Sequence, residues 1–255
     1  MKKIVVVGMG PGSMGGMTED AKAVISAADE VVGYKTYIDL LREQFPSARF
    51  YDTGMRQEED RCRYALEVAD SGKLIALVCS GDSSVYGMAA LLIEVAETSK
   101  EFSGVEIEIV PGVTAALSGS AVLGAPLTND FAVISLSNLL TPLSLIEKRL
   151  RAAASGDFCI ALYNPRSHGR PDALKNACSV LLEQIKPDTV CGWVRNIARS
   201  GEEFHFCTLK ELMSAELDMF CTAFVGNSLT RLVEHGGRTY MVTPRGYGLK
   251  TESGQ

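Results

Sequence analysis

A glycine-rich segment near the amino end carries the first residue pattern that could bind a ligand. It reads Gly10-Pro-Gly-Ser-Met-Gly15 and follows the apolar run 4–7. In dinucleotide-binding folds with this spacing, the helix starts inside the motif and its amides meet a pyrophosphate. Here the expected helix cap is Thr18, beyond the last glycine, and Pro11 removes one amide donor. The pattern therefore disfavours a pyrophosphate, while an NAD-dependent oxidoreductase that uses Gly10–Gly15 and a purely structural turn stay open as alternatives.

A second candidate site follows the very apolar run 74–79. There Ser80-Gly-Asp82 stands at the carboxyl end of a predicted strand and before the next predicted helix. Ligands of open α/β sheets bind at the carboxyl ends of the strands. Asp82 by itself could simply cap that helix. Together with the first glycine-rich loop, which also follows a strand, it predicts two walls of one crevice.

A third segment places cationic donors in one loop. Arg166, His168 and Arg170 follow a predicted strand. Because a guanidinium group can bind a carboxylate through two parallel hydrogen bonds, the loop is predicted to anchor a ligand with several carboxylates. A solvated surface loop is the alternative.

The composition limits the class of protein. The chain has 255 residues, of which 46% are apolar, so it can bury a sizeable core in one large or two modest domains. Its 25 Lys and Arg residues against 31 Asp and Glu residues give a formal charge of -6, which predicts no general attraction to nucleic acid or to an anionic membrane. The apolar run after the first lysines is too short for a secretory signal or a membrane span, so we expect a cytoplasmic protein.

Cysteine and histidine are not spaced as metal ligands. Seven cysteines form no C-x-x-C pair, so neither structural zinc nor a disulfide framework is expected, and most of them stand in apolar runs that predict buried thiols. The three histidines are scattered, and His235 is expected at the carboxyl end of a helix. No metal site is predicted.

Short apolar, β-branched runs alternate with segments of helical period, which indicates an α/β fold with mostly parallel sheets. Strands are predicted near residues 3–7, 30–33, 74–79, 105–109, 131–135, 158–162, 189–194, 203–207, 221–225 and 239–242. Helices are predicted at residues 19–28, 58–71, 85–99, 114–123, 143–154, 171–185 and 208–214. The turn residues at 199–201 would allow the strands 189–194 and 203–207 to pair in antiparallel fashion.

The small residues of segment 111–128, with Pro and Gly near both ends, predict a closely packed connector between two sheets. We therefore expect an N-terminal α/β domain at 1–120, a C-terminal α/β domain at 121–250 and a polar tail at 251–255.

Four motifs in this order resemble the tetrapyrrole methylase superfamily, whose members use S-adenosylmethionine (SAM), and the similarity spans nearly the whole chain. They are Val7–Gly12 running on to Thr18, Ser80–Asp82, Pro111–Ala116 and Phe224–Ser228. Two further stretches, Gly54–Glu58 and Leu162–Ser167, resemble one branch, the precorrin-3B C17-methyltransferases of cobalamin biosynthesis. Ser83 stands where the family's Gly-Asp-Pro triplet has proline, as is similar in this branch, which predicts a less rigid loop.

The resemblance implies two α/β domains with SAM in the cleft between them, in a homodimer. It implies methylation of C17 of precorrin-3B, with contraction of the macrocycle to precorrin-4. The cobalt-containing counterpart, cobalt-factor III, is an alternative acceptor. A noncatalytic tetrapyrrole carrier is a further alternative, which would have an apolar binding surface but no second cofactor site.

The resemblance and the loops together suggest site residues. Because a sulfonium is a cation, Asp82 with the carbonyl groups of Gly81 and Val85 suits SAM better than a pyrophosphate. The cofactor-binding candidates are Met9, Gly10, Pro11, Gly81, Asp82, Val85, Tyr86, Thr114, Ala115, Tyr163 and Asn227. Ring contraction moves protons, for which Tyr163, His168 and Asp82 are the candidate acids or bases. Arg56, Arg166 and Arg170 are the candidates for binding the acetate and propionate arms.

Overall fold

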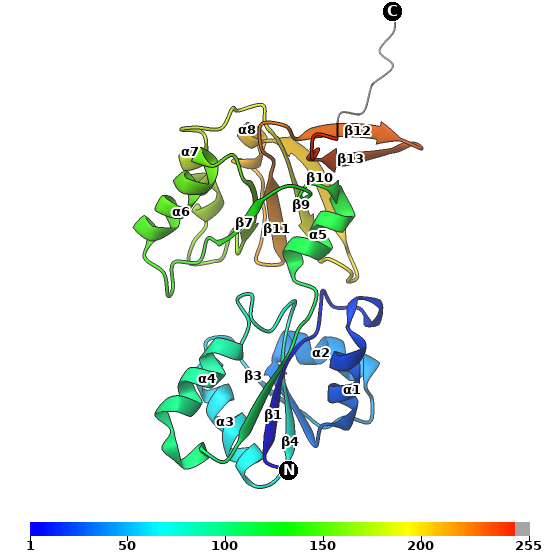
Figure 1. Cartoon of the computed structure of the whole chain (residues 1–255), viewed down its shortest axis with the longest axis vertical. Helices are drawn as coiled ribbons and strands as arrows, with labels where there is room; N and C mark the ends of the chain where they lie inside the picture. Colours follow the sequence, from blue (N-terminus) through cyan, green and yellow to red (C-terminus); the bar gives the residue numbers. More distant parts are fainter. Residues whose placement is uncertain (248–255) are drawn as a thin grey trace, which may run out of the picture. The chain divides into compact units, whose positions relative to one another are not determined.

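The computed structural model describes residues 1–247 and confirms the α/β class (Figure 1). The chain divides into two compact units, Met1–Ala115 and Ala116–Gln255. This division lies within the predicted connector 111–128, a few residues before the boundary expected at 120. The predicted tail 251–255 lies outside the described residues.

The first unit is built on a five-stranded sheet in which every pairing is parallel. Its strands are β1 (Lys3–Gly8), β2 (Glu30–Tyr34), β3 (Phe50–Thr53), β4 (Leu74–Cys79) and β5 (Glu106–Val110), in the order β3-β2-β4-β1-β5. β1 and β4 are neighbours inside this sheet and are buried on both faces, which is why their sequences are continuously apolar rather than alternating.

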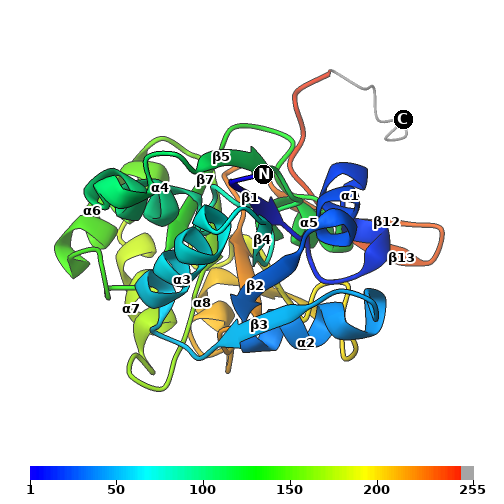
Figure 2. The same cartoon turned by 90° about the horizontal axis from the view of Figure 1, so that it is seen from below.

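Two helices cover each face of this sheet (Figures 1 and 2). They are α1 (Glu19–Ala27) and α2 (Lys35–Gln44) on one face, and α3 (Glu58–Asp70) and α4 (Ala89–Thr98) on the other. Short 3-10 turns lie at Met14–Gly16 and Lys100–Phe102. Thr18 caps α1 as predicted, since its hydroxyl accepts a hydrogen bond from the amide of Ala21 at 3.2 Å.

Three features of the first unit differ from the sequence-based expectation. The predictions missed α2 and β3, because α2 starts directly after β2 with no side-chain cap and β3 has only four residues. The helix predicted from residue 85 begins at Ala89. It starts late because the carboxylate of Asp82 binds the amides of Ser84 and Val85 and holds them in an irregular turn.

The second unit contains a mixed sheet. Its strands are β7 (Phe131–Ser135), β8 (Cys159–Tyr163), β9 (Val190–Arg195), β10 (Glu203–Thr208) and β11 (Cys221–Val225), in the order β10-β9-β11-β8-β7. Only β7 and β8 pair in parallel, whereas β11 runs antiparallel to both β8 and β9. β10 pairs with β9 in antiparallel fashion, as the turn residues between them allow.

Among the described residues of this unit, the remaining elements are four helices and a small sheet. The helices are α5 (Ala115–Leu123), α6 (Leu143–Ser155), α7 (Ala173–Leu181) and α8 (Leu209–Leu212). The small sheet has the order β12 (Arg231–His235), β13 (Arg238–Val242) and β6 (Gly124–Ala125). Among residues 1–247, no helix is long and apolar enough to cross a bilayer.

His235 does not end a helix, which corrects the sequence-based expectation. It is the last residue of β12, and Gly236-Gly237 forms the turn to β13 with φ angles of +60° and +76°. Two consecutive left-handed residues are what a tight hairpin turn requires, so this glycine pair signals a hairpin.

Candidate functional site

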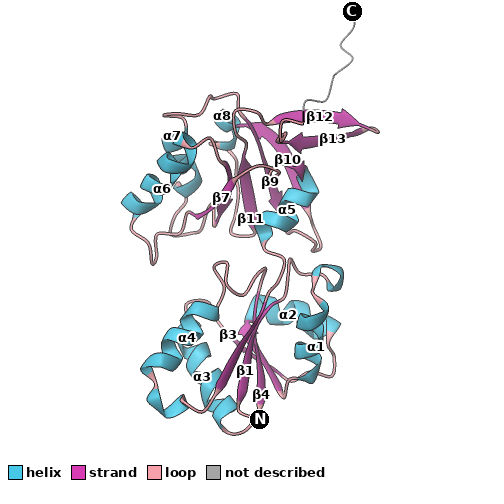
Figure 3. Ribbon diagram, viewed as in Figure 1, coloured by secondary structure: helices cyan, strands magenta, loops and turns pink. Residues whose placement is uncertain are grey.

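The loops after β1 and β4 flank the point at which the connections of the first sheet change face. β1 continues to α1 on one face, whereas the neighbouring β4 continues to α4 on the opposite face. The crevice outside two such strand ends is the usual ligand site of an open α/β sheet. The structure therefore brings together, at one end of the first sheet, the two loops that the sequence singles out (Figure 3).

Close backbone contacts join these loops and depend on glycine. The amide of Gly10 donates to the carbonyl oxygen of Gly81 at 3.0 Å, and the amide of Gly81 donates back to Gly10 at 2.8 Å. Both residues have a φ of +69°, in the left-handed region that favours glycine. A Cβ atom on Gly112, in the loop after β5, would overlap the backbone of Gly81 and Gly8. Three chain segments can therefore meet only because these positions lack side chains.

Asp82 holds the same three-segment junction through its carboxylate. Oδ1 accepts from the amides of Ser84 at 2.8 Å and Val85 at 3.0 Å, and Oδ2 accepts from the amide of Gly112 at 3.0 Å. Burial by itself would raise the pKa of Asp82, but these amides and that of Ser83 hold the pKa below its ordinary value. Asp82 therefore stays ionised at neutral pH and leaves a negative charge in the junction.

Two hydroxyl groups add hydrogen bonds between these loops and the end of β5. Ser83 is fully buried and donates to the carbonyl oxygen of Val110 at 2.9 Å, and Thr18 donates to that of Pro111 at 3.4 Å. The sequence predicts a less rigid loop because Ser83 replaces a proline. The serine hydroxyl supplies a hydrogen bond that proline cannot make, so the loop is fastened to β5 in another way.

The chemistry of the junction suits a cation rather than a phosphate. Residues 8–18, 80–88 and 111–114 contain no Lys or Arg, and Asp82 is their single carboxylate. The amides of Gly10, Gly81 and Gly112 are already bonded within the protein. A pyrophosphate would need such donors, whereas an ionised carboxylate attracts a positive group such as a sulfonium. The carbonyl oxygen of Gly81, expected as a sulfonium partner, accepts the amide of Gly10 and keeps a second lone pair for a ligand.

The remaining cofactor-binding candidates of the first unit lie in the same loops. They are Met9, Pro11, Val85, Tyr86, Thr114 and Ala115. The side chain of Met9 is fully buried and its amide donates to the carbonyl oxygen of Cys79 at 2.9 Å. Met9 can thus support the loop but presents no side chain to a ligand, whereas Tyr86 is 55% exposed.

Non-glycine residues with left-handed backbone conformation gather at the carboxyl ends of the strands in both sheets. They are Arg56 after β3, Tyr86 after β4, Asn164 after β8, and Asn196 and Ala198 after β9, while Asp157 precedes β8. Each such conformation costs about 1–3 kcal/mol and persists where the surroundings hold it, which is common in functional loops. Three of these positions, Arg56, Tyr86 and Asn164, therefore lie in loops that carry candidate residues.

In the second unit, the carboxyl ends of β7, β8 and β9 share one edge of the sheet. Tyr163 ends β8 there, and its hydroxyl oxygen accepts from the amide of Ala116 in α5 at 2.6 Å. The next loop carries the half-buried Arg166 and the exposed His168. Neither side chain forms a hydrogen bond or an ion pair with another of residues 1–247.

Arg170, which the sequence predicts to bind a carboxylate, is partly committed to the protein backbone. Its Nη1 donates to the carbonyl oxygen of Leu136 at 2.8 Å and to that of Asn164 at 3.4 Å. Burial lowers the pKa of this guanidinium. Arg170 therefore braces the chain ends after β7 and β8, and with them the loop that carries Arg166.

Asn227 does not join Tyr163, although both are cofactor-binding candidates. It follows β11, which runs antiparallel to β8, so it lies at the opposite edge of the sheet. Its neighbour Ser228 binds Asp157, which precedes β8, through two hydrogen bonds of 2.9 Å and 2.6 Å. A strand of five or six residues separates the two edges by roughly 20 Å. The side-chain oxygen of Asn227 accepts the amide of Leu229 and shapes a turn.

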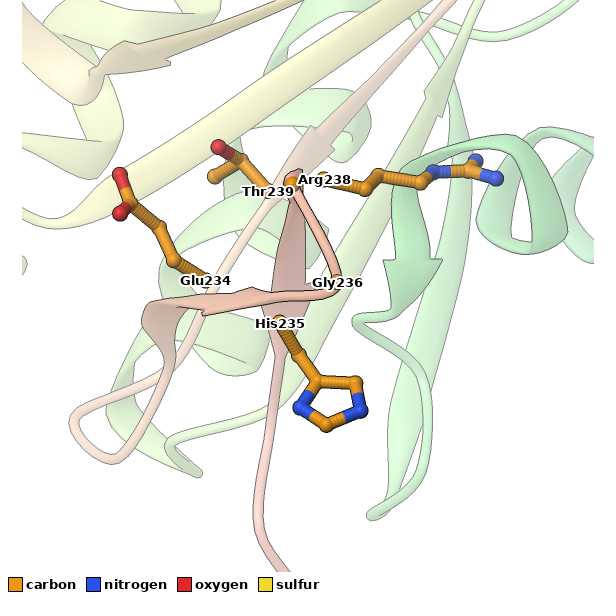
Figure 4. A pocket seen from close by; sticks show the side chains of 6 residues that line it. Glu234, His235, Gly236, Arg238 and Thr239 are labelled. Carbon is orange, nitrogen blue, oxygen red and sulfur yellow. The ribbon is translucent and has the colours of Figure 1, made fainter.

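A hollow of about 290 Å³ lies beside the β12–β13 hairpin and is lined by residues 234–239. Figure 4 shows the side chains of Glu234, His235 and Arg238 pointing away from one another. Arg238 is engaged with the carbonyl oxygen of Val122 at 2.8 Å. Diverging side chains do not form a catalytic or binding cluster, and none of the candidate residues lines this hollow.

Most of the thiols are buried, as the apolar runs predict. Six of the seven cysteines are buried, and burial raises the pKa of Cys62, Cys178 and Cys207 to about 12. Among the described residues, no group of three or more His, Cys, Asp or Glu side chains could hold a metal ion.

Two functional candidates are not evident from the sequence. Arg61 stands among charged residues in segment 54–63, a composition typical of a solvated surface, yet it is 3% exposed. Gly112 lies in a quoted motif, but nothing local reveals that its amide meets Asp82 from 30 positions away. The one indication in the sequence was that Gly112, like Gly10 and Gly81, follows a predicted strand.

The first unit has an all-parallel sheet whose strand ends are joined by glycine contacts around one ionised carboxylate, and the second unit has a mixed sheet. These features define a two-unit α/β protein of the class whose ligand sites lie at strand ends. Over residues 3–213, the sequence matches the family model described as Tetrapyrrole (Corrin/Porphyrin) Methylases. The chain belongs to the tetrapyrrole methylase family.

Several relatives carry more specific names. The chain is 43% identical to a probable cobalt-factor III C(17)-methyltransferase of Salmonella typhimurium, over 96% of this chain and 99% of that protein. It is 41% identical to a cobalt-factor III methyltransferase of Priestia megaterium, over 97% of this chain but only 46% of that longer protein. Among solved structures, the methyltransferase CobJ is 36% identical with a TM-score of 0.85, covering 94% of this chain and 99% of that one.

Proposed function

We propose that the protein is a SAM-dependent C-methyltransferase of cobalamin biosynthesis, which methylates C17 of a tetrapyrrole as the macrocycle contracts. The observation that carries the proposal is the near full-length similarity to the Salmonella protein. The junction around Asp82 supports it independently, because its charge suits a sulfonium cofactor.

Two acceptors fit this activity. Precorrin-3B, which would give precorrin-4, is the acceptor that the motifs suggest. Cobalt-factor III is favoured by a specific observation, since the relatives with 41% and 43% identity are named for it. The same residues would serve both acceptors, so the distinction rests on the presence of cobalt.

The loops of the first unit would hold SAM, which supplies an activated methyl group for in-line transfer to the ring carbon. The ionised Asp82 would favour the positive charge near the crevice, and its three amide contacts would keep the loops fixed. Alignment of the reacting carbon with the methyl group can contribute about 7–11 kcal/mol to the rate. No side-chain nucleophile is needed for such a transfer.

Proton transfer during ring contraction would fall to Tyr163 or His168. Asp82 suits this role less well, because both of its oxygens accept amides and its pKa is lowered. Arg56 and Arg166, which have no partner among residues 1–247, would bind carboxylate arms of the acceptor.

The deciding experiment is anaerobic incubation with SAM and each acceptor, followed by mass spectrometry. We expect S-adenosylhomocysteine together with an acceptor that gains one methyl group. SAM binding without turnover of either acceptor would contradict the proposed reaction. Binding of NAD without SAM would favour the oxidoreductase, and tetrapyrrole binding without SAM would favour the carrier.

A homodimer in the cytoplasm forms part of this proposal, as in the family that the motifs resemble. Light scattering of the purified protein would test the dimer. A mass near that of one 27.4 kDa chain would contradict it.

A further inference from the structure

Arg61 on α3 is an unusually placed cation. Its side chain is 3% exposed, and no carboxylate oxygen of residues 1–247 lies within ion-pair distance of it. Burial lowers the pKa of this guanidinium, with partial compensation from the charge of Glu58. Because a buried unpaired charge is costly, an apolar side chain would serve packing alone better. The guanidinium therefore needs an explanation beyond the core.

The hydrogen bonds of Arg61 point to the turn that follows β3. Nε donates to Oγ1 of Thr53 at 2.7 Å, and Nη2 donates to the carbonyl oxygen of Gly54 at 3.0 Å. A weaker contact of 3.8 Å joins Nη1 to the sulfur of Met88. From the other side, Oε1 of Gln57 accepts from the amide of Gly54 at 2.8 Å. Gly54 is thus fixed at both its amide and its carbonyl group.

Arg56 lies in this fixed turn, between Gly54 and Gln57. This residue has a φ of +63°, which is unfavourable for a side chain with a Cβ atom and persists only where the surroundings enforce it. Arg56 is exposed and has no hydrogen-bond or ion-pair partner among residues 1–247. It follows β3, so it stands at the same edge of the first sheet as the loops around Asp82.

We propose that Arg61 is a positioning residue that holds the turn 53–58 so that Arg56 is preoriented to bind a carboxylate arm of the tetrapyrrole. This inference rests on the proposed function. Preorientation matters because binding by an arginine on a mobile loop orders both the loop and the side chain, and a turn that is already fixed removes the cost of ordering the loop. Arg61 itself touches neither the acceptor nor SAM in this arrangement.

A double-mutant cycle on the full chain tests the proposal. The variants are Arg61→Lys, Arg56→Ala and both together, with Arg63→Lys as the control. Arg63 lies on the same helix but pairs with Glu59 at the surface. The measurement is the dissociation constant of cobalt-factor III and of precorrin-3B, followed by absorbance in the presence of S-adenosylhomocysteine so that no methyl transfer occurs. SAM affinity is measured separately by calorimetry.

We expect Arg61→Lys to weaken tetrapyrrole binding about tenfold when Arg56 is present, because a lysine cannot bind Thr53 and Gly54 with a planar fork. In the Arg56→Ala background the same change should matter less than about twofold. SAM affinity and the Arg63→Lys control should stay at the wild-type level.

Equal effects of Arg61→Lys in both backgrounds, no effect, or an equal loss of SAM affinity would overturn the inference. Should Arg61→Lys fail to fold, the exposed Gln57 offers a second variant, because Gln57→Ala removes the side-chain oxygen that accepts the amide of Gly54. Gln57→Ala then replaces Arg61→Lys in the double-mutant cycle, and it should likewise weaken tetrapyrrole binding only when Arg56 is present. Because binding is measured without catalysis, a failure of methyl transfer would count against the proposed function alone.

Discussion

At the scale of single residues, the candidate site separates side chains that hold loops from side chains that are free to bind. Asp82 and Ser83 fasten the junction of the first unit, and Arg170 fastens the loop after β8. Arg56 and Arg166 have no partner among residues 1–247. Replacing a fastening residue should therefore change stability or SAM affinity, and replacing a free arginine should change tetrapyrrole affinity.

Asp82→Asn keeps the shape of the side chain but removes its charge and one of its two acceptor oxygens. We expect SAM affinity to fall about tenfold or more, since a hydrogen bond to a charged group contributes about 1.5–3 kcal/mol. Calorimetric titration with SAM would measure this. Wild-type affinity in the variant would remove Asp82 from the cofactor site.

The stability difference between the wild type and Asp82→Asn should depend on pH. The pKa of Asp82 is lowered on folding, so its contribution to the free energy of unfolding is present above the unfolded-chain pKa of about 4 and is lost as the pH falls through the folded value. The stability advantage of the wild type over Asp82→Asn should therefore be largest at neutral pH and shrink below about pH 4. Urea unfolding across this range would check it, and an advantage that grows on acidification would contradict the lowered pKa.

The two arginines after β8 should respond differently to replacement by alanine. Arg166→Ala should weaken tetrapyrrole binding about tenfold with little change in melting temperature, because its guanidinium has no internal partner. Arg170→Ala should lower the melting temperature, because it leaves the carbonyl groups of Leu136 and Asn164 without a donor. Thermal melts and binding titrations on both variants would show whether these roles are reversed.

At the scale of elements, the loops at the strand ends depend on backbone contact rather than on side-chain packing. Gly8, Gly81 and Gly112 let the segments after β1, β4 and β5 meet. An irregular turn precedes α4 because the amides of Ser84 and Val85 donate to the carboxylate of Asp82. The geometry of this edge should therefore be sensitive to a single methyl group.

Gly112→Ala should destabilise the protein by at least about 1–3 kcal/mol, because the new Cβ atom would overlap backbone that cannot move independently. Gly15→Ala is the matched control, since its Cβ atom would meet no atom within 4 Å. Chemical denaturation of the two variants would measure the difference. Similar stabilities would mean that the three segments are not held together in solution.

At the scale of the whole molecule, each unit has its own apolar core. The sheet of the first unit is covered on both faces by helices of the same unit, and the second unit has a separate core around α6 and α7. A core of this kind is what allows a segment of roughly 100 residues to fold alone.

Residues 1–115 expressed alone should therefore fold and unfold cooperatively. Circular dichroism during a thermal melt would test this, with the full chain as the reference. A broad, non-cooperative transition would show that the first unit needs the second for stability.

The amino-acid sequence alone determined the α/β class, most strands, and the loops that carry the candidate residues. These features follow from local signals: continuous apolar runs for buried strands, Thr18 for a helix start, and glycine clusters where strands end. β3 and α2 were missed because one is short and the other lacks a cap.

Only the tertiary structure decided which residues meet. The antiparallel direction of β11 separates Asn227 from Tyr163, although both belong to motifs of the same family. The amide of Gly112 completes the contacts of Asp82, and Arg61, which stands among charged residues in the sequence, is buried and bonded to the turn that carries Arg56. Contacts between residues distant in the chain depend on strand order and direction, which no local pattern encodes.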